Sequence, residues 1–433
     1  MPIRLNHLGR GWALIGLILG VSLILRIGYN LTLDNEFPFR ADAGKYITLA
    51  LNLVNYGVYS LGNSAPLDVS TLITPGYPLL LSLILKLTND LSIAYTATLV
   101  LQAVMGTGTV FLTYLIASQC KVPKLAAIAS MAIIAFYPHQ ITSGGLILTE
   151  TLFTFLMMLA TSLIIRGLGS AKSGVWIWAG VILGLAALTR PIALPIGIGI
   201  WLTLIILQPN LGGLRRALPA AILPLLIFAP WLAFSQLHHD ENQVSNAKSV
   251  FALGTYPNFI YKSNQYFGFP HREDPDYPKM QESLAFTLSD LKQRAESEPL
   301  KYLHWYTVGK PSTLWQWEII QGAGGANIYP IKHSLYDNSR LYSYSYSLLN
   351  AVHPILVLLA FLACLYTIWQ ACVYHLTRER ANLLILASIF GYIAVVHTLM
   401  ASLPRFSIPF QPIMILLAAS WLTQRKEYRG TKK

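Results

Sequence analysis

Few strongly polar residues border the apolar segments of this sequence, so each one can be weighed as a candidate for chemistry. The five candidates are Asp42, Glu150, Arg190, Lys310 and Arg405. Ionisable side chains next to or within membrane segments are costly, and by default they indicate a functional site. A carboxylate can accept a proton from a reacting group, and fixed guanidinium or ammonium groups can stabilise developing negative charge.

Each candidate also has a purely structural explanation. Asp42 could cap the helix that follows it, and Glu150 could be a first-turn acid favoured by the helix dipole. Arg190 and Arg405 could extend their charged ends to the membrane surface, and Lys310 could be an ordinary surface lysine. Capping does not exclude catalysis, so both explanations stay open for Asp42 at this stage.

The stretch His238-His239-Asp240 raises the question of a metal site. Adjacent histidines in a strand or a helix point in different directions, and no carboxylate-rich motif accompanies this pair. We therefore interpret the stretch as a polar loop and expect that neither a metal nor another cofactor is required. If a divalent ion were bound, these three residues would be the first ligands to test.

Familiar nucleotide-binding and hydrolase motifs do not occur in the sequence. There is no GxGxxG after a strand, no P-loop, no GxSxG and no HExxH. A donor of a chemical group would have to be recognised in another way. A lipid-borne donor would suit a site at the membrane surface.

The elements that must position the candidates are transmembrane helices. Hydrophobic residues make up 54% of the 433 residues, charged residues make up 12%, and mean hydropathy is +0.50. Soluble domains carry roughly twice this fraction of charge. We expect an all-α integral membrane protein with about ten spans, since each span uses about 20 residues. The predicted spans are 11–31, 92–118, 125–145, 147–166, 174–189, 192–208, 217–236, 346–370, 382–400 and 406–422.

Basic residues give the predicted orientation. The net charge of +12 comes from Lys and Arg that lie mostly in short loops between apolar runs, as in the positive-inside bias of membrane proteins rather than in nucleic-acid binding. With the spans above, these loops and both termini lie in the cytoplasm. All five candidates then fall on the outer side. Arg26 also approaches the outer face, because it lies about 22 Å along the first span.

The predicted organisation has three parts. Residues 1–236 form a transmembrane region with spans 1–7, which includes a first extracytoplasmic loop over 34–74. Residues 237–343 form a large extracytoplasmic loop, and residues 344–433 hold spans 8–10 and a cytoplasmic tail. The apolar part of 75–89 covers about 13 residues, too short for a span, so we expect a helix at the outer interface.

Residues 41–55 predict an amphipathic helix at the same interface. One expected face is apolar, with Tyr46, Leu49, Ala50, Leu53 and Val54. The opposite face is polar, with Lys45, Thr48, Asn52 and Asn55.

Short motifs follow one another along nearly the whole chain. They are Asp42-Ala-Gly-Lys-Tyr46, Asn55-Tyr-Gly-Val-Tyr-Ser60, Thr74-Pro-Gly-Tyr-Pro78, Leu148-Thr-Glu150, Leu188-Thr-Arg-Pro191, Ala229-Pro-Trp231, Lys310 with Trp315, and Leu403-Pro-Arg-Phe406. In this order they resemble the GT-C glycosyltransferases, and more narrowly the protein O-mannosyltransferase and aminoarabinose-transferase branch. The chain departs from the aminoarabinose enzymes in having Thr74-Pro-Gly where they have Lys-Pro-Pro. It also lacks the Arg-Asn pair that follows the Pro-Trp in many relatives.

The resemblance implies an inverting glycosyltransferase. It would move a sugar from a polyprenyl-phosphate-linked donor to an acceptor hydroxyl or lipid on the extracytoplasmic face. Asp42 would take the proton of the acceptor, and Glu150 would orient the acceptor or the surroundings of Asp42. Residues that would bind the lipid phosphate or the sugar are Arg190, Lys310, Arg405, Arg26, Lys45, Tyr46 and Tyr77.

The expected partners are the lipid-linked donor, membrane lipids and a glycan, glycolipid or protein acceptor, with no nucleic acid. The expected location is a bacterial or archaeal plasma membrane. A polytopic lipid or glycan transporter or flippase is the main alternative. Such proteins place charges near the middle of the membrane, however, whereas here the charges collect at one face. A non-enzymatic subunit that gathers lipid-linked sugar for a partner is a third possibility.

Overall fold

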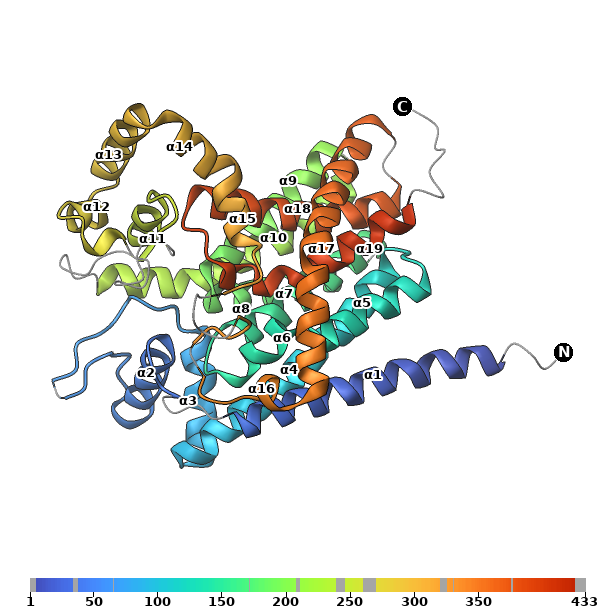
Figure 1. Ribbon diagram of the computed structural model, residues 1–433, viewed down its shortest axis with the longest axis horizontal. Helices are drawn as coiled ribbons and strands as arrows, with labels where there is room; N and C mark the ends of the chain where they lie inside the picture. The colour runs from blue at the N-terminus through green and yellow to red at the C-terminus, as the bar shows by residue number, and fades with distance from the viewer. Residues whose placement is uncertain are drawn as a thin grey trace.

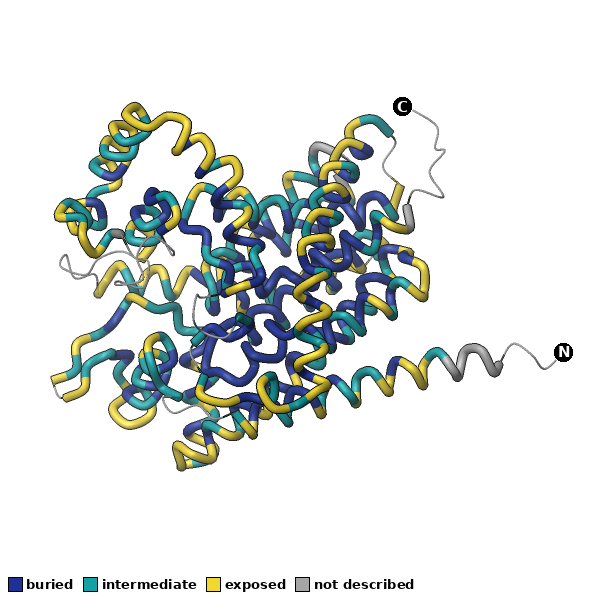
Figure 2. Tube along the Cα trace, viewed as in Figure 1, coloured by how far each residue is buried: buried dark blue, intermediate teal, exposed yellow. Residues whose placement is uncertain are grey.

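The computed structural model describes residues 5–33, 38–64, 66–170, 172–207, 211–238, 246–259, 270–319, 325–329, 331–374 and 377–424. Throughout these ranges the chain forms helices and connecting segments, and it forms no β-strand. The prediction of an all-α membrane protein is confirmed. Buried residues concentrate in the centre of the helical bundle (Figure 2).

Seven helices of the described part are long and apolar enough to cross a membrane. They are α1 (Leu5–Thr32), α4 (Leu91–Gln119), α7 (Glu150–Leu168), α10 (Leu211–Leu237), α17 (Arg340–Val373), α18 (Arg378–Leu399), and α19 (Gln411–Gln424) with the two 3₁₀ turns that precede it. An eighth span is formed if α5 (Lys124–Phe136) and α6 (Pro138–Thr142) are counted as one helix bent by 54°.

The predicted number of ten spans is not confirmed. The two remaining predicted spans coincide with α8 (Ser173–Thr189) and α9 (Leu194–Leu207), which are apolar but shorter, at 17 and 14 residues. A short 3₁₀ turn, η2 (Pro191–Ala193), joins these two helices. Both helices pack against α10, so they belong to the bundle although each falls short of a full crossing.

Two groups of shorter helices lie together at one end of the bundle, opposite the start of α1 (Figure 1). The first group is α2 (Asp42–Tyr56) and α3 (Gly76–Thr88), which pack against each other. The second group is α11 (Asn246–Gly254), α12 (Tyr277–Glu282), α13 (Leu284–Ser297), α14 (Pro299–His304), a π-helical turn η4 (Trp305–Gly309) and α15 (Lys310–Leu314). A single turn, α16 (Leu335–Asn338), leads into α17.

The predicted helix over 41–55 is present as α2, but the assignment of its faces was partly wrong. Asn52, expected on the polar face, is buried and donates hydrogen bonds to the carbonyls of Ser60 and Gly62, each at 2.9 Å. Val54, expected on the apolar face, is exposed. The cause is the loop after α2, which folds back over the helix and presents carbonyl groups that need a donor.

Candidate active site

Four of the predicted site residues converge at the end of the bundle where α2 lies. Arg405 donates from Nη1 to Oδ2 of Asp42 and from Nε to Oε1 of Glu150, both at 3.0 Å, and its Nη2 lies 2.9 Å from the same Oε1. Arg190 donates from Nη2 to the same Oε1 at 2.7 Å. Two carboxylates and two guanidiniums therefore form one continuous ion-pair network, which we call the four-residue cluster.

The two carboxylates of the four-residue cluster have different surroundings. Glu150 is 0% exposed, and its Oε1 receives all three guanidinium contacts. The Asp42 side chain is 36% exposed and is held by a single contact from Arg405. Removing one partner of a buried ion pair leaves an uncompensated charge, so Glu150 and the arginines stabilise one another. Because only Asp42 is exposed, it is the carboxylate of the pair that a substrate can reach.

Three members of the four-residue cluster lie at helix ends. Asp42 is the first residue of α2, where the preceding Ala41 has a φ of 50°. Its carboxylate bonds Arg405, and no side-chain cap bond is formed at this helix start. Glu150 is the first residue of α7, and Arg190 follows the last residue of α8. Charges at helix ends lie where the hydrocarbon region gives way to headgroups.

The Thr74-Pro-Gly motif contributes to placing Arg190. The hydroxyl of Thr74 donates to the carbonyl of Thr189 at 3.2 Å. A Cβ atom on Gly76 would lie 2.7 Å from the backbone of Leu188 and Thr189, so α3 begins directly against the end of α8. Arg190 adopts an extended backbone, as expected before a proline, and its Nε donates to the hydroxyl of Thr149 at 2.8 Å.

Arg405 lies in a segment without α-helical structure that leads into the last span. It is the middle residue of the 3₁₀ turn η5 (Pro404–Phe406), which is followed by η6 (Ile408–Phe410) and then α19. Gln140 of α6 donates to the carbonyl of Ile408 at 2.6 Å and to Oε1 of Gln411 at 3.1 Å. This buried amide fixes the segment three residues beyond Arg405.

Tyrosines line the approach to the cluster. Tyr46 lies one turn after Asp42 on α2, and its ring meets that of Tyr77 edge to face at 5.3 Å. Burial, together with the charges of Asp42 and Glu150, raises the pKa of Tyr46 to about 12. Tyr77 is fully buried and donates to Oε1 of Gln102 at 2.8 Å, so it supports the ring of Tyr46 from the interior of the protein. Lys45 has an exposed side chain on α2.

Tyr329 was missed in the sequence analysis. It packs against the same apolar cluster as Tyr46, and the guanidinium of Arg40 lies 5.6 Å from its ring centre. Burial raises the pKa of Tyr329, while the charge of Arg405 opposes this shift and that of Asp42 adds to it. The sequence contains many tyrosines in loops, and nothing in the spacing of this one distinguishes it from the others.

Two predicted site residues lie elsewhere. Arg26 is buried between helices, where Nη1 donates to the hydroxyl of Ser22 at 2.7 Å and to the carbonyl of Ala135 at 3.1 Å. Its Nη2 donates to the carbonyl of Ile134 at 3.1 Å, at the bend between α5 and α6. Lys310 is 0% exposed and its Nζ donates to the carbonyl of Met400 at 2.9 Å. Neither contacts a member of the four-residue cluster in the described structure.

The stretch proposed as a possible metal site is only partly described. His238 ends α10 as an exposed residue whose Nδ1 lies 2.9 Å from the carbonyl of Phe234. His239 and Asp240 lie outside the described residues. Among the residues that the structure does describe, no group of three or more His, Cys, Asp or Glu side chains is arranged to hold a metal ion.

Comparison with known proteins gives a family match over part of the chain and a shared fold. The family model of the dolichyl-phosphate-mannose-protein mannosyltransferases matches residues 73–234. No curated protein matches the chain in sequence. Residues 73–234 include Glu150 and Arg190, whereas Asp42 and Arg405 lie outside the matched range.

Two solved structures share the architecture. One is the archaeal oligosaccharyltransferase AglB from Archaeoglobus fulgidus, in complex with an inhibitory peptide and a dolichol-phosphate. It is 12% identical, with a TM-score of 0.55 over 96% of this chain and 50% of that one. The other is ArnT from Cupriavidus metallidurans bound to undecaprenyl phosphate, 12% identical, with a TM-score of 0.51 over 96% of this chain and 60% of that one. This chain thus spans about half to three-fifths of their length, and the likeness is one of fold.

Proposed function

We propose that this chain, a member of the GT-C glycosyltransferase superfamily by its matched family model and its fold, transfers a sugar from a polyprenyl-phosphate-linked donor to an acceptor on the extracytoplasmic face of the membrane. The observation that carries the proposal is the bond between Arg405 and Asp42. It puts a solvent-accessible carboxylate beside two fixed guanidiniums at the end of a membrane bundle.

In the proposed reaction, the acceptor oxygen attacks the anomeric carbon of the sugar while Asp42 takes the hydroxyl proton. The bond between the anomeric carbon and the phosphate oxygen breaks, and its electron pair stays with the polyprenyl phosphate. A direct displacement of this kind inverts the anomeric carbon. Asp42 suits the role of base because it is the exposed carboxylate of the four-residue cluster, whereas Glu150 is enclosed.

The leaving phosphate gains charge in the transition state and needs fixed donors to stabilise it. Arg190 and Arg405 are the candidates, with side chains 17% and 16% exposed. Glu150 holds both in place, which limits the reorganisation needed at the moment of transfer. The relatives give independent support for this donor class, since AglB is described with a dolichol-phosphate and ArnT with undecaprenyl phosphate.

The proposal is tested with the purified chain in lipid nanodiscs and a panel of undecaprenyl-phosphate-linked hexoses and pentoses. Release of undecaprenyl phosphate with an acceptor extract from the cell envelope is measured by mass spectrometry. The wild type and Asp68→Asn, an exposed aspartate in the loop after α2, should be equally active. Asp42→Asn should lose about 10² to 10⁴ in rate. Activity of Asp42→Asn within a few-fold of the wild type would refute Asp42 as the base.

A further inference from the structure

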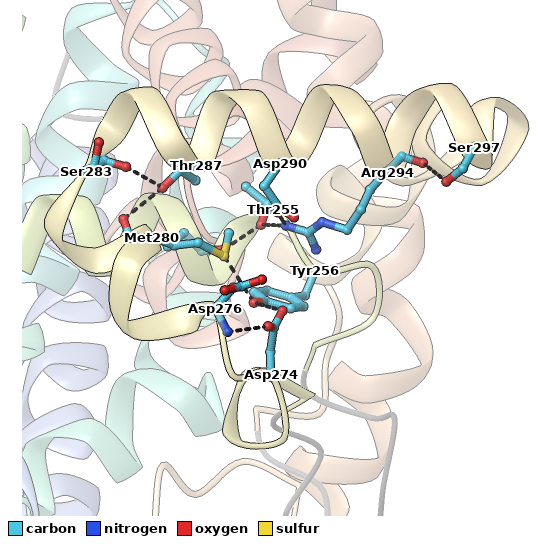
Figure 3. Close-up of polar contacts among 11 residues, drawn as sticks. Thr255, Tyr256, Asp274, Asp276, Met280, Ser283, Thr287, Asp290, Arg294 and Ser297 are labelled. Atoms are coloured by element: carbon cyan, nitrogen blue, oxygen red, sulfur yellow. Dashed lines mark hydrogen bonds and ion pairs between the residues drawn. The ribbon is translucent and has the colours of Figure 1, made fainter.

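A compact unit outside the bundle is cross-linked by its own polar contacts. Arg294 of α13 donates to the hydroxyl of Thr255 at 3.0 Å, and its guanidinium lies over the ring of Tyr256 at 4.6 Å (Figure 3). The hydroxyl of Tyr256 donates to Asp274 at 2.6 Å, and that of Thr287 to the carbonyl of Met280 at 2.8 Å. Helices α11 to α13 are therefore tied together, and we call them, with α14, η4 and α15, the loop unit.

The loop unit meets the bundle at the end of α18. A Cβ atom on Gly254 would lie only 2.4 Å from the carbonyl oxygen of Met400, so α11 contacts the backbone there directly. Ala401 is buried in the same apolar cluster as Tyr256 and Trp305. The indole of Trp305 donates to the carbonyl of Gly254 at 3.1 Å. The contact therefore involves the backbone just after α18.

Lys310 makes a second contact between the loop unit and the segment after α18. Its Nζ donates to the carbonyl of Met400 at 2.9 Å and lies 3.8 Å from the ring centre of Tyr306. The hydroxyl of Ser402 donates back to the carbonyl of Lys310 at 2.6 Å. Two reciprocal bonds thus fix residues 400–402 against the loop unit.

The π-helical turn explains how Lys310 comes to point at α18. An α-helix advances by about 100° per residue, so the one extra residue of a π-turn rotates everything after it by about that angle. The turn η4 covers the five residues directly before Lys310. Such turns are rare and often occur at functional sites. A fully buried lysine that pairs with no carboxylate among the described residues is also costly, and an apolar side chain would fill the space with less desolvation.

We infer that Lys310 is a positioning residue for the reaction proposed above, holding the loop unit against residues 400–402 and thereby setting the place of Arg405. Arg405 lies five residues beyond Met400, and Gln140 holds the far end of the same segment through Ile408. The other end of this segment, residues 400–402, is held by the loop unit. Lys310 therefore acts on the phosphate only through Arg405, rather than as a phosphate ligand itself.

The inference is tested with Lys310→Met, which keeps an unbranched side chain one atom shorter and removes its N–H donors. The matched control is Lys292→Met, an exposed lysine on α13. Hydrogen exchange of the amides in 400–407 should become about tenfold faster in Lys310→Met and stay unchanged in the control. The rate constant kcat/KM for the donor should fall about 10- to 100-fold, since a shift of about 1 Å in a catalytic group has an effect of that order.

Two readouts separate failure of this inference from failure of the proposed function. If the wild type shows no transfer, the proposed function is refuted. Faster exchange in Lys310→Met would still establish the contact between Lys310 and residues 400–402. If the wild type is active, unchanged exchange or an unchanged kcat/KM in Lys310→Met overturns the positioning role. Loss of affinity for undecaprenyl phosphate with unchanged exchange would instead assign Lys310 to the phosphate and overturn it too.

Ser402→Ala keeps the test decisive if Lys310→Met does not fold. It removes only the reciprocal bond to the carbonyl of Lys310. Exchange in 400–407 and kcat/KM should change in the same directions as for Lys310→Met, by about threefold, since a single neutral hydrogen bond contributes about 0.5–1.5 kcal/mol. Wild-type exchange and wild-type kinetics in Ser402→Ala would contradict the inference.

Discussion

Asp42 and Arg405 are 363 residues apart in the chain and are joined by a hydrogen-bonded ion pair of 3.0 Å. The same guanidinium makes two further contacts with the buried Glu150. Arg405 thus bridges an exposed and an enclosed carboxylate with three of its N–H groups. This bridge links the exposed Asp42 to the interior of the bundle through a single arginine side chain.

Lysine should not replace arginine at position 405. Arg405→Lys keeps one positive charge but loses the planar fork, so it cannot serve Asp42 and Glu150 together. We expect kcat/KM for the donor to fall about 10- to 100-fold, since one charge-assisted bond of about 1.5–3 kcal/mol is lost. Arg405→Ala should be more severe and should also destabilise the protein, because Glu150 loses a partner. Donor titrations of both variants check this.

The control for these variants is Arg216→Lys, at a partly exposed arginine of α10 that bonds its own helix. It should match the wild type. If Arg405 merely extended its charge to the membrane surface, Arg405→Lys would also match the wild type in rate and donor affinity. That result would exclude a role for Arg405 in holding the phosphate.

Arg26 should affect stability rather than donor binding. Arg26→Met leaves the carbonyls of Ile134 and Ala135 without this donor at the bend between α5 and α6, and each unpaired buried group costs about 1–3 kcal/mol. The midpoint of thermal unfolding should fall, while the folded fraction keeps its affinity for undecaprenyl phosphate within twofold. If the variant has normal stability but has lost affinity for undecaprenyl phosphate, Arg26 would have to be assigned to donor binding instead.

The stability of the protein should depend on pH through Lys310. Burial lowers the pKa of Lys310 from 10.5 to about 7. Between these two values the unfolded chain holds a proton that the folded chain lacks, so the free energy of unfolding rises with pH. The contribution approaches about 1.4 kcal/mol per pH unit. Below about pH 7 both states carry the proton and the contribution is flat.

Lys310→Met removes this dependence, and comparison with the wild type cancels the titration of all other groups. Unfolding of both proteins is followed at pH values from 6 to 9. The free energy of unfolding of the wild type, relative to that of Lys310→Met, should be lowest at the acid end and rise toward pH 9. A difference that stays constant over this range would mean that the amine of Lys310 is solvated.

The orientation in the membrane remains a prediction from the basic loops, with 34–74 and 237–343 outside and both termini inside. It is tested in a Cys372→Ser background, because Cys372 is exposed while Cys120 and Cys364 are buried. An impermeant thiol reagent should label cysteines at Asn63 and Ser297 in intact cells, and one at Ser173 only after lysis. The reverse pattern would place the four-residue cluster on the cytoplasmic side.

The sequence by itself determined the class of the protein. Long apolar runs and sparse charge allow only helices that satisfy their own backbone groups in lipid, and the motifs around Asp42, Glu150, Arg190 and Arg405 indicated a GT-C relative. The short length of α3 was also predicted, and 13 residues are too few to cross the hydrocarbon region; its place at the outer interface stays a prediction. Each of these conclusions depends on local composition.

The tertiary structure decided what each charged side chain does. Three long basic side chains lie near helix ends, but their partners differ. Arg26 bonds a carbonyl at the bend between α5 and α6, and Lys310 bonds a carbonyl at the end of α18. Of the three, only Arg405 contacts carboxylates. The partner of a flexible side chain is set by whichever acceptor the packing of distant helices leaves within reach. Since that packing joins residues hundreds of positions apart, no local pattern in the sequence can specify it.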